Sequence, residues 1–219
     1  MDAKTFAQCV DHTLLKPDAT LNQLQKLCEE ARAHQFFSVC VHPTYIQASQ
    51  KFLNNTNVKI CTVVGFPLGA TTTKAKAFET QQAVEWGASE IDMVVALGAV
   101  KNGEWSYVET DIRAVVQSAN GAGVKVILET CFLTDAEKIR ICQIVKNSGA
   151  CFVKTSTGFG SAGATVADIE LMRKTVGSDF GVKASGGIRD WSFAQALIQA
   201  GANRLGLSAS VEILKNAEF

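Results

Sequence analysis

Residues 124–155 read VKVILETCFLTDAEKIRICQIVKNSGACFVKT, with a short apolar run at each end and an amphipathic segment between them. Thr134 and Glu137 have the spacing of a capping box, in which each side chain binds a free backbone amide at the start of a helix. Gly149 stands where this helix is expected to end, because glycine readily adopts the left-handed conformation of a helix C-terminus. The segment therefore predicts a strand, a helix and a second, parallel strand.

The same alternation extends along the whole chain. Apolar or β-branched runs predict eight strands, at residues 9–13, 36–41, 58–64, 90–95, 124–129, 151–155, 181–185 and 204–208. Segments of helical length lie between them, at residues 20–34, 72–86, 104–120, 134–147, 165–175 and 190–199. Eight such units close naturally into an α/β fold of the (β/α)8 or TIM-barrel type, which we expect to form one domain over residues 1–219. An open doubly wound sheet also alternates, but it has fewer strands and no G-x-G-x-x-G follows the first run.

Composition narrows the possible partners and the compartment. The 219 residues include 21 basic and 21 acidic side chains, a balance that gives no electrostatic reason to expect nucleic acid or a membrane surface as partner. The seven cysteines contain no C-x-x-C pair and are expected to be free thiols in a reducing compartment. Neither a secretory signal nor an apolar run of membrane-spanning length is present, so we expect a soluble, cytoplasmic protein.

Among the charged residues within the predicted strands, three stand out: Asp92, Lys154 and Lys183. Strands of a parallel sheet are normally almost continuously apolar, and a buried, unpaired charge is strongly unfavourable. Either these groups point outward at strand ends and reach water, or they cluster and compensate one another. In a barrel the second arrangement is possible, because the carboxyl ends of all strands meet at the face where catalytic groups gather.

Two lysines and one aspartate suit a Schiff-base aldolase. A lysine amine adds to a carbonyl only when it is neutral, and both burial and a second cation nearby favour the neutral form. The protonated imine then accepts electrons as a carbon–carbon bond breaks, and a carboxylate with water moves the protons. Lys154, Lys183 and Asp92 are therefore the predicted catalytic residues.

Two glycine-containing segments predict a phosphate site. Gly186 and Gly187 follow the seventh predicted strand, and Gly206 and Ser208 lie in the eighth. Barrels often bind phosphate with the loops after these strands and the start of a short extra helix, here expected at residues 211–215. Tight turns in a compact barrel would also account for the glycines. The expected partner is a small phosphorylated sugar.

Metal and thiol chemistry are less well supported. His12, His34 and His42 lack metal-ligand spacing, so we expect no metal and no cofactor, and a zinc-dependent aldolase is disfavoured. Cys40 is two residues from His42 in the sequence, so the two could form a nucleophilic cysteine–histidine pair. A buried structural thiol is the favoured interpretation of Cys40.

The sequence resembles the deoxyribose-phosphate aldolases, a family of lysine-dependent class I aldolases, from end to end. The resemblance is carried by segments 11–17 (DHTLLKP), 38–43 (SVCVHP), 64–70 (VGFPLGA), 90–95 (EIDMVV), 152–159 (FVKTSTGF) and 182–189 (VKASGGIR). It implies reversible, metal-independent cleavage of 2-deoxy-D-ribose 5-phosphate to D-glyceraldehyde 3-phosphate and acetaldehyde. It also implies a cytosolic enzyme that is often a homodimer.

The resemblance assigns roles to individual residues. It implies that Lys154 forms the Schiff base, that Lys183 favours the neutral amine of Lys154, and that Asp92 transfers protons. The expected substrate-binding residues are Asp11 and Cys40 near the sugar, and Gly158, Gly186, Gly187, Gly206 and Ser208 in the phosphate loops. Leu207, Ala209 and Ala162 depart from the family pattern in these loops, which bears on phosphate affinity.

Two other functions fit the same residues. One is a different lysine-dependent barrel lyase, such as a transaldolase or a sugar-acid aldolase. The other is a barrel that binds a sugar phosphate without catalysis. The three strand charges argue against the second alternative, because without catalysis they would only destabilise the barrel.

Overall fold

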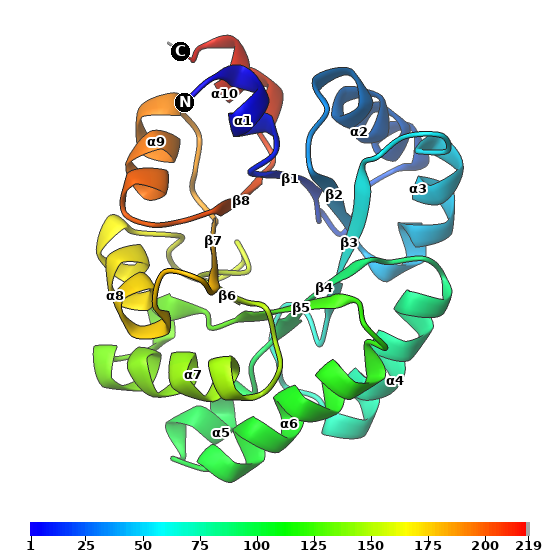
Figure 1. Ribbon diagram of the computed structural model, residues 1–219. Helices are drawn as coiled ribbons and strands as arrows, with labels where there is room; N and C mark the ends of the chain where they lie inside the picture. The colour runs from blue at the N-terminus through cyan, green and yellow to red at the C-terminus, as the bar shows by residue number, and fades with distance from the viewer. Residues whose placement is uncertain (218–219) are drawn as a thin grey trace.

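The computed structural model describes residues 1–217 and shows a closed barrel of eight parallel strands, in chain order, surrounded by helices (Figure 1). The strands are β1 (Val10–Leu14), β2 (Ser38–Val41), β3 (Lys59–Val64), β4 (Glu90–Val94), β5 (Gly123–Ile127), β6 (Phe152–Lys154), β7 (Gly181–Ser185) and β8 (Arg204–Leu207). The helices are α1 (Ala3–Ala7), α2 (Leu21–His34), α3 (Ile46–Phe52), α4 (Thr73–Glu85), α5 (Leu97–Lys101), α6 (Trp105–Ser118), α7 (Asp135–Asn147), α8 (Val166–Val176), α9 (Trp191–Gln199) and α10 (Ser210–Lys215). Short 3₁₀ turns occur at η1 (Pro43–Tyr45) and η2 (Thr130–Phe132).

The predicted (β/α)8 fold is confirmed. Each of the eight predicted strands is present, with ends shifted by at most two residues, and the predicted helical segments correspond to α2, α4, α6, α7, α8 and α9. Thr134 and Glu137 form the reciprocal capping box at the start of α7, and Gly149 after that helix has a positive φ of 84°. The predicted short helix after the last strand is α10. Within residues 1–217, none of the helices combines the length and apolar character needed to cross a membrane.

The side chains along each strand alternate between two environments. One set of side chains faces the helices and forms the main hydrophobic core, as Ile91 and Met93 do on β4 and Val182 and Ala184 do on β7. The other set faces the barrel interior, where polar and charged groups predominate. Asp92 illustrates this set, because its carboxylate reaches Lys183 on β7, a strand that does not neighbour β4 in the sheet. The barrel therefore has an apolar shell and a charged centre.

Candidate active site

The three predicted catalytic residues meet at one oxygen atom inside the barrel. Asp92 Oδ2 accepts hydrogen bonds from Lys154 Nζ at 2.7 Å and from Lys183 Nζ at 2.8 Å. The sheet register aids this meeting, since Lys154 on β6 lies directly beside Lys183 on β7. Of the two arrangements that the sequence allowed, the charges form the compensated cluster and do not point outward.

Asp11 lies deeper in the same cluster. Its carboxylate accepts hydrogen bonds from Lys183 Nζ, from Arg204 at 2.9 Å and from Ser38 Oγ at 2.7 Å. Arg204 also binds Glu90 at 3.0 Å, and its guanidinium carbon lies 3.6 Å from the centre of the Phe37 ring. Asp11 is thus a second carboxylate partner of Lys183, beside Asp92.

Sequence reasoning missed Lys125, which completes the cluster. Lys125 Nζ lies 2.9 Å from Asp92 Oδ1 and 2.7 Å from Glu90 Oε2, and the residue is fully buried on β5. It holds the carboxylate oxygen of Asp92 that the two other lysines leave free, and so orients Asp92 toward Lys154. The sequence carries for Lys125 the same signal that identified the other two lysines, a charge within an apolar run. Lys125 stands between Val124 and Val126, just as Lys154 and Lys183 stand within their own apolar runs.

Mutual pairing keeps most of these groups ionised. Burial alone would raise the pKa of Asp92, but the charges of Lys125, Lys154 and Lys183 outweigh burial and hold the pKa well below its usual range. Burial alone would lower the pKa of Lys183, but the carboxylates of Asp11 and Asp92 hold that pKa above its ordinary value. Lys183 is therefore a permanent cation beside Lys154 at neutral pH.

The cluster contains one more basic than acidic group. Its acids are Asp11, Glu90 and Asp92, and its bases are Lys125, Lys154, Lys183 and Arg204. Lys183 and Arg204 each bridge two carboxylates and Lys125 contacts three, whereas Lys154 pairs with Asp92 alone. Lys154 is therefore the cation of this cluster with the fewest carboxylate partners.

A cavity of about 280 Å³ opens above Lys154. Its wall consists of segments 13–16, 157–159 and 185–188 together with Lys154, Gly206 and Ser208. The predicted phosphate-loop residues Gly158, Gly186, Gly187, Gly206 and Ser208 thus all line the same space as Lys154. Lys16 also lines it and is a second basic group that sequence reasoning did not single out. Asp11 and Cys40 are fully buried below this wall, so their predicted contact with the sugar stays a prediction.

The glycine loops are held by close packing. The amide of Ala164 donates to the carbonyl oxygens of Ser185 and Gly186, each at 3.1 Å, which joins the loop after β6 to the loop after β7. A Cβ on Gly163 would overlap the carbonyl of Gly186, so this position admits only glycine. Gly186 and Gly187 both line the cavity and have positive φ, a conformation that other residues rarely adopt. The alanine at position 162 therefore leaves the essential close approach intact.

A larger hollow of about 760 Å³ lies at the opposite, amino-terminal end of the barrel. Its wall includes segments 35–37 and 55–59, which precede β2 and β3, and it contains none of the predicted site residues. Catalytic groups of such barrels lie at the carboxyl ends of the strands, so the smaller cavity above Lys154 is the candidate active site.

The histidines and Cys40 take structural positions. His12 bridges Ser210 and Glu30, each at 2.9 Å, on the helical side of β1, and His42 bonds the carbonyl of Leu15 at 3.0 Å. Strand β2 ends at Val41, so Cys40 and His42 do not share a strand face as a nucleophilic pair would. Cys40 instead packs beside Cys61 and Leu15 in a small cluster inside the barrel.

Comparison with known proteins places this site in a family. The sequence model of the DeoC/LacD family aldolases matches residues 5–214. The chain belongs to this family. It is 58% identical to a deoxyribose-phosphate aldolase of Streptococcus pneumoniae (strain Taiwan19F-14) over 206 residues, 94% of each chain. It is 57% identical to a deoxyribose-phosphate aldolase of Geobacillus sp. (strain WCH70), over 96% of this chain and 95% of the relative.

A solved member of the family has the same fold. The deoxyribose phosphate aldolase of Aeropyrum pernix, described as a tetramer, superposes with a TM-score of 0.92 at 33% identity. The match covers 98% of this chain and 91% of that one. The resemblance inferred from the sequence motifs is therefore confirmed, and the chain is an aldolase of this family.

Proposed function

We propose that the protein catalyses the reversible cleavage of 2-deoxy-D-ribose 5-phosphate to D-glyceraldehyde 3-phosphate and acetaldehyde, with Lys154 as the Schiff-base residue. The observation that carries this proposal is the position of Lys154, 3% exposed at the floor of the cavity and hydrogen-bonded to the same Asp92 oxygen as Lys183. Relatives at 57–58% identity bear the name of this activity.

The charge cluster positions Lys154 for the reaction. Lys154 has one carboxylate partner, Asp92, which it shares with the cation of Lys183. The neutral amine adds to the aldehyde carbon of the open-chain sugar, and loss of water gives a protonated imine. Asp92, in hydrogen-bond contact with the amine, is placed to move protons through a water molecule during these steps.

The imine then drives cleavage. A base removes the proton of the 3-hydroxyl, the bond between C2 and C3 breaks, and its electrons pass into the imine to give an enamine. Glyceraldehyde 3-phosphate leaves, the enamine takes up a proton at C2, and water releases acetaldehyde from Lys154. The cation of Lys183 persists throughout, because its two carboxylate partners remain in place.

The far wall of the cavity suits the phosphate group. Gly158, Gly186 and Gly187, all with positive φ, present backbone with no side chain in the way, and the exposed Ser208 adds a hydroxyl. Lys16 adds a positive charge to the rim. Anchoring the phosphate here orients the reacting end of the sugar toward Lys154, and remote binding of this kind raises kcat as well as affinity.

The remaining parts of the proposal concern the setting of the enzyme. We propose that the whole chain, residues 1–219, is one catalytic unit that needs no metal or cofactor and acts in the cytoplasm. Its partner is the small phosphorylated sugar, with neither nucleic acid nor membrane involved. A homodimer is the proposed assembly, although the Aeropyrum pernix relative is described as a tetramer.

A pair of variants tests the reaction and the phosphate site together. Gly187→Asp places a carboxylate in the open space beside the proposed phosphate position, and Gly187→Asn is its matched control with the same shape and backbone strain but no charge. For Gly187→Asp we expect kcat/KM on deoxyribose 5-phosphate to fall at least tenfold below that of the asparagine control. On unphosphorylated deoxyribose the two variants should be equal.

Three results would count against the proposal. Equal losses for both variants on the phosphorylated sugar would place the phosphate elsewhere. No release of acetaldehyde from deoxyribose 5-phosphate by the wild-type protein would exclude the reaction itself. Turnover of ketose or sugar-acid substrates in its place would favour the transaldolase or sugar-acid aldolase alternative.

A further inference from the structure

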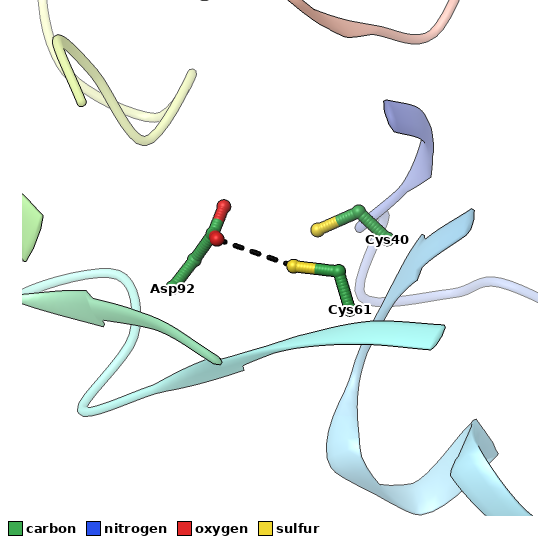
Figure 2. A group of neighbouring side chains, drawn as sticks. All are labelled: Cys40, Cys61 and Asp92. Atoms are coloured by element: carbon green, nitrogen blue, oxygen red, sulfur yellow. Dashed lines mark hydrogen bonds between the residues drawn. The ribbon is translucent and has the colours of Figure 1, made fainter. Parts of the chain in front are cut away.

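Two thiols and a carboxylate converge inside the barrel, beside the active-site lysines. Cys40 on β2 and Cys61 on β3 are direct partners in the sheet register, and both are fully buried. Cys61 Sγ lies 3.1 Å from Asp92 Oδ1, and the ligand atoms of Cys40, Cys61 and Asp92 all lie within 4.8 Å of one another. Figure 2 shows the two sulfur atoms pointing into the same space as the Asp92 carboxylate.

These three donor atoms favour one class of metal ion. Two thiolates and a carboxylate oxygen suit a thiophilic divalent cation such as Zn²⁺ or Cd²⁺ rather than the hard cations Mg²⁺ and Ca²⁺, which prefer oxygen alone. We propose that Cys40, Cys61 and Asp92 form a binding site for a thiophilic divalent cation, and that occupation of this site inhibits the enzyme.

The charge balance makes such a site feasible in a buried place. Each thiol releases one proton to solvent as its sulfur binds the metal, so a cation of charge +2 replaces two protons and the net charge of the cluster does not change. Asp92 accepts hydrogen bonds from three lysines as a carboxylate does, so its oxygen can bind the metal without release of a further proton.

Inhibition follows from the residue that the two sites share. Asp92 orients Lys154 and Lys183 through Oδ2, and Lys125 through Oδ1. A metal ion on this carboxylate competes with all three lysines and takes away the group that is proposed to transfer protons. Leu15 packs against the thiols and also lines the active-site cavity, so the proposed metal site adjoins that cavity.

Within residues 1–217, the other comparably spaced donor group consists of Asp11, Cys61 and Glu90. It offers a single thiol, and Arg204 bridges its two carboxylates at 2.9 and 3.0 Å. The proposed site has a second sulfur, from Cys40, and Zn²⁺ and Cd²⁺ prefer thiolate ligands. The pair of cysteines therefore defines the proposed site.

Cadmium titration of the reduced wild-type enzyme tests the proposal directly. We expect one Cd²⁺ per chain, a thiolate-to-cadmium charge-transfer band in the ultraviolet, and a ¹¹³Cd NMR resonance in the range of a two-sulfur site. Cys40→Ser and Cys61→Ser should each weaken binding at least tenfold. Cys142→Ser is the matched control, since Cys142 is equally buried but lies on α7 in the main hydrophobic core, and it should bind Cd²⁺ like the wild type.

The inhibition is measured separately. Zn²⁺ should reduce the activity of the wild-type enzyme at the same concentration that fills the site, and EDTA should restore the activity. For Cys61→Ser, the Zn²⁺ concentration that halves the activity should be at least tenfold higher, with the activity of each protein expressed relative to its own metal-free rate.

Binding of the metal is measured without substrate, so a wrong assignment of the reaction would leave the binding test intact. Binding unaffected by either serine variant, a ¹¹³Cd resonance without sulfur ligands, or full activity with the site occupied would each overturn the proposal. The ¹¹³Cd resonance needs no variant and decides the matter even if the serine variants fail to fold.

Discussion

Two of the buried lysine–aspartate pairs are alike in distance and differ in their surroundings. Lys76 on α4 pairs with Asp111 on α6 at 2.6 Å, outside the barrel. Lys154 on β6 pairs with Asp92 on β4 at 2.7 Å, inside it. The amine of Lys76 also donates to the carbonyl of Val94 at 2.9 Å, and Thr73 donates to the other oxygen of Asp111. In this pair outside the barrel, called the outer pair, Lys76 and Asp111 each have one further hydrogen-bond partner; Lys154 and Asp92 form the inner pair.

The difference shows what turns a buried lysine into a candidate nucleophile. In the described part of the chain, Lys76 is the one lysine that pairs with the Asp111 carboxylate, and it does not line the cavity above the barrel. Lys154 shares its carboxylate with Lys125 and Lys183 in a cluster that carries surplus positive charge, and it lines that cavity. Burial and pairing are therefore common to structure and catalysis, whereas a shared counter-ion and access to substrate are features of the inner pair alone.

The largest difference between the pairs should appear when each lysine is replaced by arginine. Lys154→Arg keeps the positive charge, but a guanidinium stays protonated and cannot form an imine, so turnover should fall to the uncatalysed background. Lys76→Arg should retain turnover in whatever fraction of the protein folds. Steady-state assays on protein of verified fold check both. Substantial activity in Lys154→Arg would exclude covalent catalysis at this residue.

Asp92→Asn removes the shared charge while keeping the shape of the side chain. We expect turnover to fall by about a hundredfold or more, which is the usual scale of general acid–base catalysis. Circular dichroism should show a folded barrel, because Glu90 and Asp11 still offer carboxylates to Lys125 and Lys183. Near-normal turnover would make Asp92 a structural residue like Asp111.

Lys183→Leu tests the effect of the neighbouring cation. Without this charge, protonated Lys154 is less disfavoured, so the rising limb of the activity–pH profile should move to higher pH. Activity at neutral pH should fall and recover in part as the pH rises. Asp11 keeps Arg204 and Ser38 as partners, which limits the structural cost. A profile that drops in height without moving would assign Lys183 to proton transfer or substrate positioning.

The smallest effect on catalysis should come from breaking the outer pair. Lys76→Met leaves Asp111 buried without its cation, which should lower the free energy of unfolding by about 3–5 kcal/mol. Replacing both residues, as Lys76→Met with Asp111→Leu, should restore much of that loss because no lone charge remains. Urea unfolding measures the stabilities, and kcat of the folded variants should stay near that of the wild type. A marked fall in kcat with intact folding would contradict a purely structural role.

The sequence predicts the fold well because the barrel repeats one local pattern. Every strand run carries its own signal, and the helix α7 is marked at both ends by its capping box and Gly149. The helices α1, α3 and α5 escaped prediction because five to seven residues are too few to show an amphipathic period.

The site is predictable in its members but not in its contacts. Charges within apolar runs identify Asp92, Lys154 and Lys183, and the same rule applied throughout would have added Lys125. Which lysine shares which oxygen depends on the register of β4 to β7, and no local pattern records that register. The meeting of Cys40 and Cys61 has the same origin, since each residue reads as an ordinary buried thiol in its own strand.

The most direct test of Lys154 as the covalent residue is borohydride reduction in the presence of acetaldehyde, followed by peptide mass spectrometry. Reduction traps the imine, so we expect one two-carbon adduct per chain, located on Lys154, with Lys76, Lys125 and Lys183 unmodified. Lys154→Arg serves as the control and should remain unlabelled. A stable adduct on another buried lysine, or no adduct on a protein that still cleaves deoxyribose 5-phosphate, would show that Lys154 is not the covalent residue.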